Sequence, residues 1–159
     1  MALEHRGPNR LGRFTSHHRL ATPVAPWERL KIGGGTPPVL TRHGWLMIYH
    51  GVAEAAELSD GRRRLCYSAG VMVLSKEHPR VVRYRSAEPV LTPELPEERR
   101  GTVANVVFPT GIDRRDDLGS PERFDVYYGM ADDRIGVARL DLPDFVALGA
   151  VADPPEAEV

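Results

Sequence analysis

The stretch Trp27 to Val52, WERLKIGGGTPPVLTRHGWLMIYHGV, decides how the chain folds. Between Gly44 and Gly51 it has the aromatic and β-branched content of a strand on a largely buried, pleated surface. The two flanking glycines suit sharp turns. His50, an ionisable residue, ends this strand, where strands usually present functional groups.

Short strand-like stretches between glycines and prolines recur along the chain. The 15 glycines and 14 prolines interrupt it too often for long helices. Two successive units of short antiparallel strands, with a repeat of about 40 to 50 residues or more, are typical of propeller blades. We therefore predict an all-β fold of two blades, the second incomplete. The expected strands are residues 37–40, 45–50, 65–75 and 81–85, then 102–109, 124–129 and 135–140.

The remaining segments are expected to be connectors. Residues 52–64 are polar and predict a loop, with Asp60-Gly61 as its turn. Residues 1–26 predict a poorly packed lead-in, 27–145 the blades, and 146–159 an acidic tail. Two blades cannot close a ring. The chain is therefore expected either to associate with itself or to be part of a longer protein.

Composition excludes several classes of function. The chain has 159 residues and a net charge of −1, so neither nucleic acid nor an anionic membrane is an expected partner. No apolar run is long enough to span a membrane or resembles a signal peptide. Cys66 is the only cysteine, which fits a reducing cytoplasm. The histidines show no paired zinc-ligand spacing, so no metal site is expected.

Lys31 is the candidate anion contact. It precedes Gly33-Gly34-Gly35, where an ammonium beside exposed backbone N–H groups can bind phosphate or a sugar carboxylate. The alternative is a solvated lysine before a flexible turn. Nucleotide-binding glycine motifs are absent, so a nucleotide loop is not expected.

Three further residues are candidates for binding a substrate. His50 either faces a ligand or is buried with its ring nitrogens bonded to the backbone. Tyr67 can stack on a pyranose ring or pack in the core. Asp132 can accept hydrogen bonds from two sugar hydroxyls, or cap a turn.

Four segments together resemble glycoside hydrolase family 130, the β-mannoside phosphorylases and related mannosidases. The resemblance implies a five-bladed β-propeller and inverting phosphorolysis of β-mannosides to mannose 1-phosphate. It also implies that Lys31 contacts phosphate and that Asp132 contacts the mannosyl unit. The segments are residues 27–52, EPVLTPE at 88–94, NVVFPTG at 105–111 and VYYGMADDRIGVARLDL at 126–142.

The resemblance covers only C-terminal blades of the family. It implies that the general acid and the phosphate-binding arginines lie in N-terminal blades that this sequence lacks. We therefore assign no catalytic residue and expect the chain alone to be inactive. No cofactor is expected, with inorganic phosphate as co-substrate if the protein is a phosphorylase. The alternative is a non-catalytic carbohydrate-binding or structural remnant.

Overall fold

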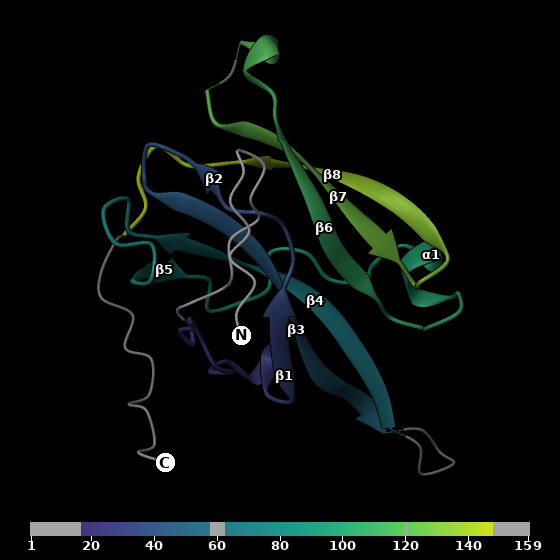
Figure 1. The fold of residues 1–159 in the computed structure, drawn as a ribbon. Helices are drawn as coiled ribbons and strands as arrows, with labels where there is room; N and C mark the ends of the chain where they lie inside the picture. Colours follow the sequence, from purple (N-terminus) through teal and green to yellow (C-terminus); the bar gives the residue numbers. More distant parts are fainter. Residues whose placement is uncertain (1–16, 58–62, 120, 148–159) are drawn as a thin grey trace, which may run out of the picture.

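The structure is a computed structural model that describes residues 17–57, 63–119 and 121–147. These residues form two antiparallel β-sheets, and Figure 1 shows one lying across the other. In the part of the chain that the structure describes, helical structure is limited to single turns, so the all-β prediction is confirmed. Within the described ranges, no helix is long and apolar enough to cross a membrane. The helical turns are η1 (Pro26–Glu28), α1 (Pro96–Arg99) and η2 (Asp116–Leu118).

The first sheet, sheet A, has the layout of a propeller blade. Its order is β1-β3-β4-β5, and β2 pairs with β3 beyond the end of β1. Between β1 and β2, Thr36 keeps the chain on β3 by donating its N–H to the Ile48 carbonyl at 2.9 Å. The strands are β1 (Lys31–Gly34), β2 (Val39–Leu40), β3 (Trp45–Glu57), β4 (Arg63–Leu74) and β5 (Val82–Arg85).

The predicted loop at residues 52–64 is wrong at both ends. β3 continues to Glu57 and β4 begins at Arg63, so the hairpin is longer than its apolar part. A two-stranded ribbon satisfies its backbone groups by pairing, and this pairing does not require buried side chains. Polar side chains are therefore compatible with strand here. The predicted turn at Asp60-Gly61 lies outside the described residues.

The second sheet, sheet B, has the order β6-β7-β8. The strand predicted at residues 102–109 begins only at Val107, because Asn105 adopts a positive φ of 59° that interrupts extended backbone. The strands predicted at residues 124–129 and 135–140 are confirmed. Three strands in the described residues agree with an incomplete second blade. They are β6 (Val107–Arg114), β7 (Arg123–Met130) and β8 (Arg134–Asp141).

Part of one face of sheet B is apolar and uncovered by other described residues. Ile135 and Val137 of β8 are 83% and 57% exposed. Exposed apolar faces often mark contact surfaces between proteins. Self-association of the chain stays a prediction.

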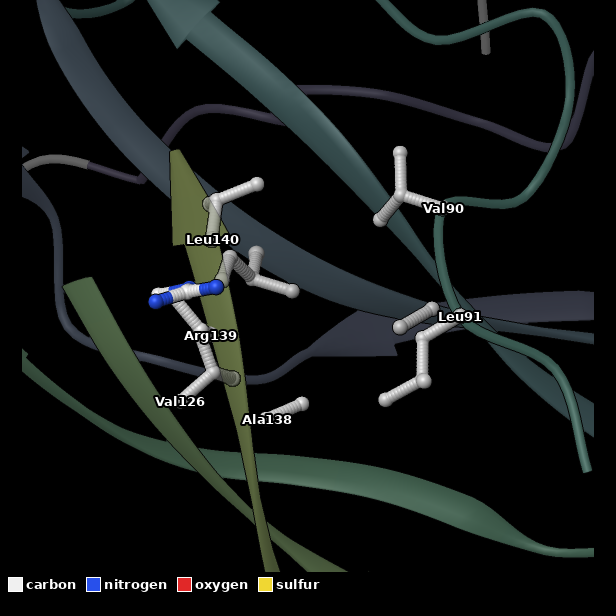
Figure 2. Close-up of a pocket in the computed structure, with 8 residues that line it drawn as sticks. Val90, Leu91, Val126, Ala138, Arg139 and Leu140 are labelled. Carbon is white, nitrogen blue, oxygen red and sulfur yellow. The ribbon is translucent and has the colours of Figure 1, made fainter. Parts of the chain in front are cut away.

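The two sheets meet through apolar side chains. Leu46 and Ile48 of β3 and Val71 of β4 form one buried cluster with Phe124 and Val126 of β7. Burying a side chain of this size contributes roughly 1.5–3 kcal/mol, so this cluster is a main source of stability. Beside it lies a cavity of about 90 Å³ with a mostly apolar lining (Figure 2).

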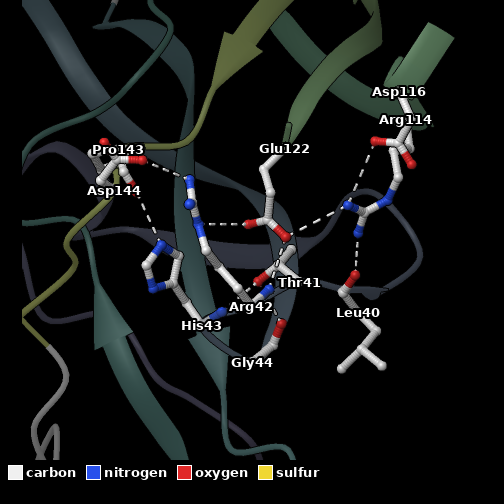
Figure 3. Close-up of polar contacts among 10 residues, drawn as sticks. All are labelled: Leu40, Thr41, Arg42, His43, Gly44, Arg114, Asp116, Glu122, Pro143 and Asp144. Atoms are coloured by element: carbon white, nitrogen blue, oxygen red, sulfur yellow. Dashed lines mark hydrogen bonds and ion pairs between the residues drawn. The ribbon is translucent and has the colours of Figure 1, made fainter. Parts of the chain in front are cut away.

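A second link between the sheets is ionic (Figure 3). Glu122 is buried just before β7, and its carboxylate accepts a hydrogen bond of 2.8 Å from the backbone N–H of Arg42. The guanidinium groups of Arg42 and Arg114 lie 3.6 and 3.5 Å from the same carboxylate. Glu122 has a φ of 60°, a conformation that costs a non-glycine residue about 1–2 kcal/mol. These contacts offset that cost.

The outer face of sheet A is covered by η1 and the residues before it. Leu20, Ala21 and Trp27 pack there against the cluster that contains Tyr49. The end of the expected lead-in therefore belongs to the packed unit. A Cβ on Gly51 would lie 2.4 Å from the Trp27 ring, so glycine is what lets the indole lie flat on the sheet.

A buried carboxylate anchors η1. Glu28 is fully buried and accepts hydrogen bonds from the backbone N–H groups of Val24 and Ala25 at 2.8 and 3.0 Å. The Tyr49 hydroxyl donates to it at 2.8 Å, and the Arg85 guanidinium lies 2.7 Å away. Burial raises the pKa of Tyr49 to about 12, so the hydroxyl keeps its proton and remains a donor.

Sheet B has a similar buried carboxylate, and no arginine pairs with it among the described residues. Glu98 of α1 is buried and accepts hydrogen bonds from the N–H groups of Glu94 and Leu95 at 2.7 and 2.9 Å. Its other oxygen accepts a hydrogen bond of 2.7 Å from the Tyr128 hydroxyl. In both blades, a Pro-x-Glu turn is thus tied to a tyrosine of a central strand. The repeat predicted from the strand pattern extends to these anchors.

The Glu28 anchor predicts an unequal response to two arginine substitutions. Arg85→Ala leaves a buried carboxylate without its cation, and we expect a loss of about 3 kcal/mol in the free energy of unfolding. Arg29→Ala removes an exposed ion pair with Glu54 and should cost less than about 1 kcal/mol. Urea unfolding of both variants measures the difference. Equal small losses would contradict the anchor.

Candidate functional site

Strand register places three of the four predicted site residues on one face of sheet A. Lys31 of β1 pairs with Val52 of β3, and Val52 pairs with Tyr67 of β4. His50 lies two residues before Val52 on β3. Because side chains alternate between faces, Lys31, Tyr67 and His50 all project from the same face. This face is the one that Ile48 turns toward sheet B.

His50 lies over β1, and Gly33 makes the room for it. Gly33 is the partner of His50 in the β1–β3 ladder, and a Cβ there would lie 2.4 Å from His50 Cε1. The ring Nδ1 is 3.1 Å from the Gly34 carbonyl oxygen. A carbonyl can only accept, so Nδ1 carries the proton and Nε2 of the neutral ring is an acceptor. Nε2 has no hydrogen-bond partner among the described residues.

The ring is flanked by aromatic groups from both sheets. Phe108 of β6 lies 4.3 Å from it, and Tyr67 lies 6.2 Å from it, between ring centroids. The Lys31 ammonium lies over the Tyr67 ring, 5.3 Å from its centroid. We call Lys31, His50, Tyr67 and Phe108 the inner-face cluster. Its members come from β1, β3, β4 and β6.

The surroundings of His50 keep its imidazole neutral. Burial lowers the pKa of His50 most, because it disfavours the charged ring, and the nearby Lys31 ammonium lowers it further. The hydrogen bond with Gly34 acts in the opposite direction but does not reverse the shift. Above this lowered pKa the cluster contains one cation, Lys31, and one neutral acceptor, His50 Nε2.

The structure does not bring Asp132 into this cluster. It lies in the β7–β8 turn, exposed, with a φ of 50°. Two backbone links connect this turn to Tyr67 through Val106. Val106 is bridged to Tyr67 on one side, and its carbonyl accepts a hydrogen bond of 3.0 Å from the Ala131 N–H on the other. Ala131, the residue before Asp132, is thus hydrogen-bonded to the residue that bridges to Tyr67.

Sequence reasoning missed Phe108 and the role of Gly33. The signal for Gly33 is the strand register, since Gly33 is opposite His50 only if β1 pairs with β3 as observed. Phe108 needs the packing of one sheet on the other, which no local pattern encodes. The structure also restricts Tyr67, because Lys31 lies over its ring. That ring has less free surface for a sugar than the sequence suggested.

The inner-face cluster carries polar groups of the kinds that contact small ligands. In residues 17–57, 63–119 and 121–147 no group of three or more His, Cys, Asp or Glu side chains could hold a metal ion. An ammonium can bind an anion, and the imidazole Nε2 can accept a hydrogen bond from a hydroxyl. An ammonium beside a neutral imidazole acceptor is chemically compatible with an anionic or hydroxyl-rich small molecule.

Comparison with known proteins identifies the family to which the chain belongs. The family profile for β-1,4-mannooligosaccharide phosphorylase, glycoside hydrolase family 130, matches residues 12–148, and the chain belongs to this family. It is 38% identical over 135 residues to a 1,2-β-oligomannan phosphorylase of Thermoanaerobacter sp. (strain X514), which covers 84% of this chain and 41% of that protein. It is 37% identical over 130 residues to a β-1,4-mannooligosaccharide phosphorylase of Ruminococcus albus, covering 82% and 36%.

Solved structures agree. A β-1,2-mannobiose phosphorylase from Listeria innocua, in complex with β-1,2-mannobiose, matches with a TM-score of 0.61 and 27% identity, over 76% of this chain and 30% of that one. The chain thus spans less than half the length of the relatives that it matches. The predicted fold is confirmed: the two sheets form part of the family's five-bladed β-propeller.

Two neighbouring glycines of β1 test the geometry of His50. Gly33→Ala places a methyl group 2.4 Å from the His50 ring, so either the ring or β1 must move. We expect a loss of about 1–3 kcal/mol of stability and a changed His50 side-chain signal in nuclear magnetic resonance spectra. Gly34→Ala is the matched control, because its methyl group would meet only Met47 Cε at 3.7 Å.

The control should leave both stability and the His50 signal nearly unchanged. If the two substitutions have the same effect, His50 does not lie over Gly33 as described.

Proposed function

We propose that this chain supplies the phosphate- and mannosyl-binding part of a β-mannoside phosphorylase. The observation that carries the proposal is the inner-face cluster, which gathers a lysine, a neutral histidine and aromatic rings on one face. The family relationship supports it. Relatives named as phosphorylases of β-1,2- and β-1,4-linked mannosides match at similar identity, so we propose no particular linkage.

Phosphate binding is assigned to Lys31. Its ammonium lies over the Tyr67 ring, 5.3 Å from the ring centroid. A charge-assisted contact between an ammonium and a phosphate oxygen is about twice as strong as a neutral hydrogen bond. Because Lys31 is exposed, added salt should screen this contact. Phosphate so held is an anionic nucleophile and needs no separate general base.

Mannosyl binding is assigned to His50 and Asp132. Nε2 of neutral His50 accepts a hydrogen bond from a sugar hydroxyl, and the Asp132 carboxylate accepts two. Asp132 is exposed at the β7–β8 turn and can reach a ligand that extends beyond the cluster. Tyr67 supports Lys31 and offers the remaining part of its ring to the sugar.

The family resemblance implies a carboxylic acid as the proton donor for the leaving oxygen, and the inner-face cluster of Lys31, His50, Tyr67 and Phe108 contains no carboxyl group. General acid catalysis contributes about 10² to 10⁴-fold to such reactions. This composition also favours the second candidate function, a carbohydrate-binding module without catalysis. Cytoplasmic location stays a prediction that rests on the single cysteine.

Ligand titration tests the binding assignments. We expect mannose to bind no tighter than about millimolar, which corresponds to roughly 4 kcal/mol. Asp132→Ala should abolish mannose binding, and Lys31→Ala should abolish phosphate binding. Lys76→Ala, an exposed cation before β5, is the matched control for the phosphate experiment. Backbone chemical shifts during each titration report the site.

Unchanged shifts at both Lys31 and Asp132, with either ligand, would disprove the proposed function. Phosphate shifts that persist in Lys31→Ala would show binding elsewhere.

The purified chain is expected to release no mannose 1-phosphate from β-mannosides. The physical reason is that binding groups without a positioned acid bind the ground state but do not protonate the leaving oxygen. Product analysis after long incubation with mannobiose and phosphate is the measurement. Release well above that of the Lys31→Ala variant would show that this chain contains a complete active site.

A further inference from the structure

We propose that Phe108 of sheet B is a positioning residue for His50 of sheet A. The phenyl ring holds the imidazole flat over Gly33, so that Nδ1 donates to the Gly34 carbonyl and Nε2 points to the ligand as an acceptor. The ligand role of His50 rests on the proposed function. The positioning itself does not depend on it.

The contact is the closest aromatic contact that His50 makes in the described chain. The ring centroids of His50 and Phe108 are 4.3 Å apart, with 33° between the ring planes. Aromatic rings in close contact attract each other beyond the effect of the apolar area that they bury. Tyr67, at 6.2 Å, is too far away to confine the ring by itself.

Gly33 and Phe108 restrict the ring together. The position of a Gly33 Cβ would be 2.4 Å from His50 Cε1 and 2.7 Å from Nε2, so the imidazole lies directly on the β1 backbone. The Gly34 carbonyl fixes one edge of the ring through the 3.1 Å bond to Nδ1. A ring that is packed against glycine backbone and phenyl has little freedom to flip. This confinement keeps Nδ1 at the Gly34 carbonyl, and the hydrogen bond there favours the tautomer with the proton on Nδ1.

Phe108 has a defined position because β6 is anchored on both sides. It pairs with Gly129 of β7, and the preceding Val106 is bridged to Tyr67 of β4. The Val106 N–H also donates to the Glu98 carbonyl at 3.0 Å. Because β6 is held in this way, the packing of sheet B on sheet A fixes the position of Phe108 against His50.

The same packing decides what His50 can bind. Phe108 removes water from the ring, and burial is the main cause of the lowered pKa of His50. The ionisable groups near the ring are Lys31 on β1 and Tyr67 on β4, while β6 contributes the uncharged Phe108. A neutral Nε2 acceptor suits a hydroxyl or a protonated phosphate oxygen. It does not suit an unprotonated anion, which is left to Lys31.

The test is nitrogen-15 spectroscopy of the histidine side chains in the full chain without ligand. In the wild-type protein we expect one His50 tautomer, protonated at Nδ1. In Phe108→Leu we expect a tautomer mixture and a pKa that rises toward the 6.5 of an ordinary histidine. Tyr127→Leu, which removes an exposed ring from β7 of the same sheet, is the control and should match the wild-type protein.

The proposal is overturned if wild-type His50 carries its proton on Nε2, or if Phe108→Leu leaves the tautomer and the pKa unchanged. It is also overturned if Tyr127→Leu changes them as much. If Phe108→Leu fails to fold, Phe108→Tyr keeps a ring and must give the wild-type tautomer, and the wild-type measurement still decides. The spectra are recorded without ligand. The test of the positioning role is therefore independent of whether mannose or phosphate binds.

Discussion

The apolar contact between the two sheets is the constraint on which the rest of the structure depends. Val71 of β4 and Phe124 and Val126 of β7 pack in one cluster, and this contact sets where β6 crosses sheet A. β6 in turn delivers Phe108 to His50. The candidate site is therefore not a property of one blade. Lys31, His50 and Tyr67 come from sheet A, and Phe108 completes the cluster where the two blades meet. Glu122 adds an ionic link between the sheets.

Each blade also carries its own anchor. Glu28 and Glu98 tie a Pro-x-Glu turn to a tyrosine, and each turn precedes a strand that contributes to the cluster. Glu28 comes three residues before Lys31, and Glu98 is bonded through its carbonyl to Val106, next to β6. Buried carboxylates of this kind stabilise a specific geometry only while every partner is present. They fix the segments that bring Lys31 and Phe108 into position.

The strands and their grouping into two blades could be predicted, because period-two apolar patterns and glycine or proline breaks are local signals. The long β3–β4 hairpin could not, since it includes the charged residues Glu54, Glu57 and Arg63, which pair in the ladder although their composition favours a loop. The late start of β6 depends on the φ of Asn105, which composition does not reveal. Lys31, His50 and Tyr67 were found as candidates, but the contribution of Phe108 depends on the packing of two sheets distant in sequence.

Sheet B completes the surroundings of His50 on sheet A through Phe108. The most direct measurement is a nuclear Overhauser spectrum with the His50 and Phe108 ring protons assigned. With ring centroids 4.3 Å apart, the account predicts strong cross-peaks between the imidazole protons of His50 and the ring protons of Phe108. Cross-peaks from Phe108 only to residues of sheet B, with none to His50, would contradict it.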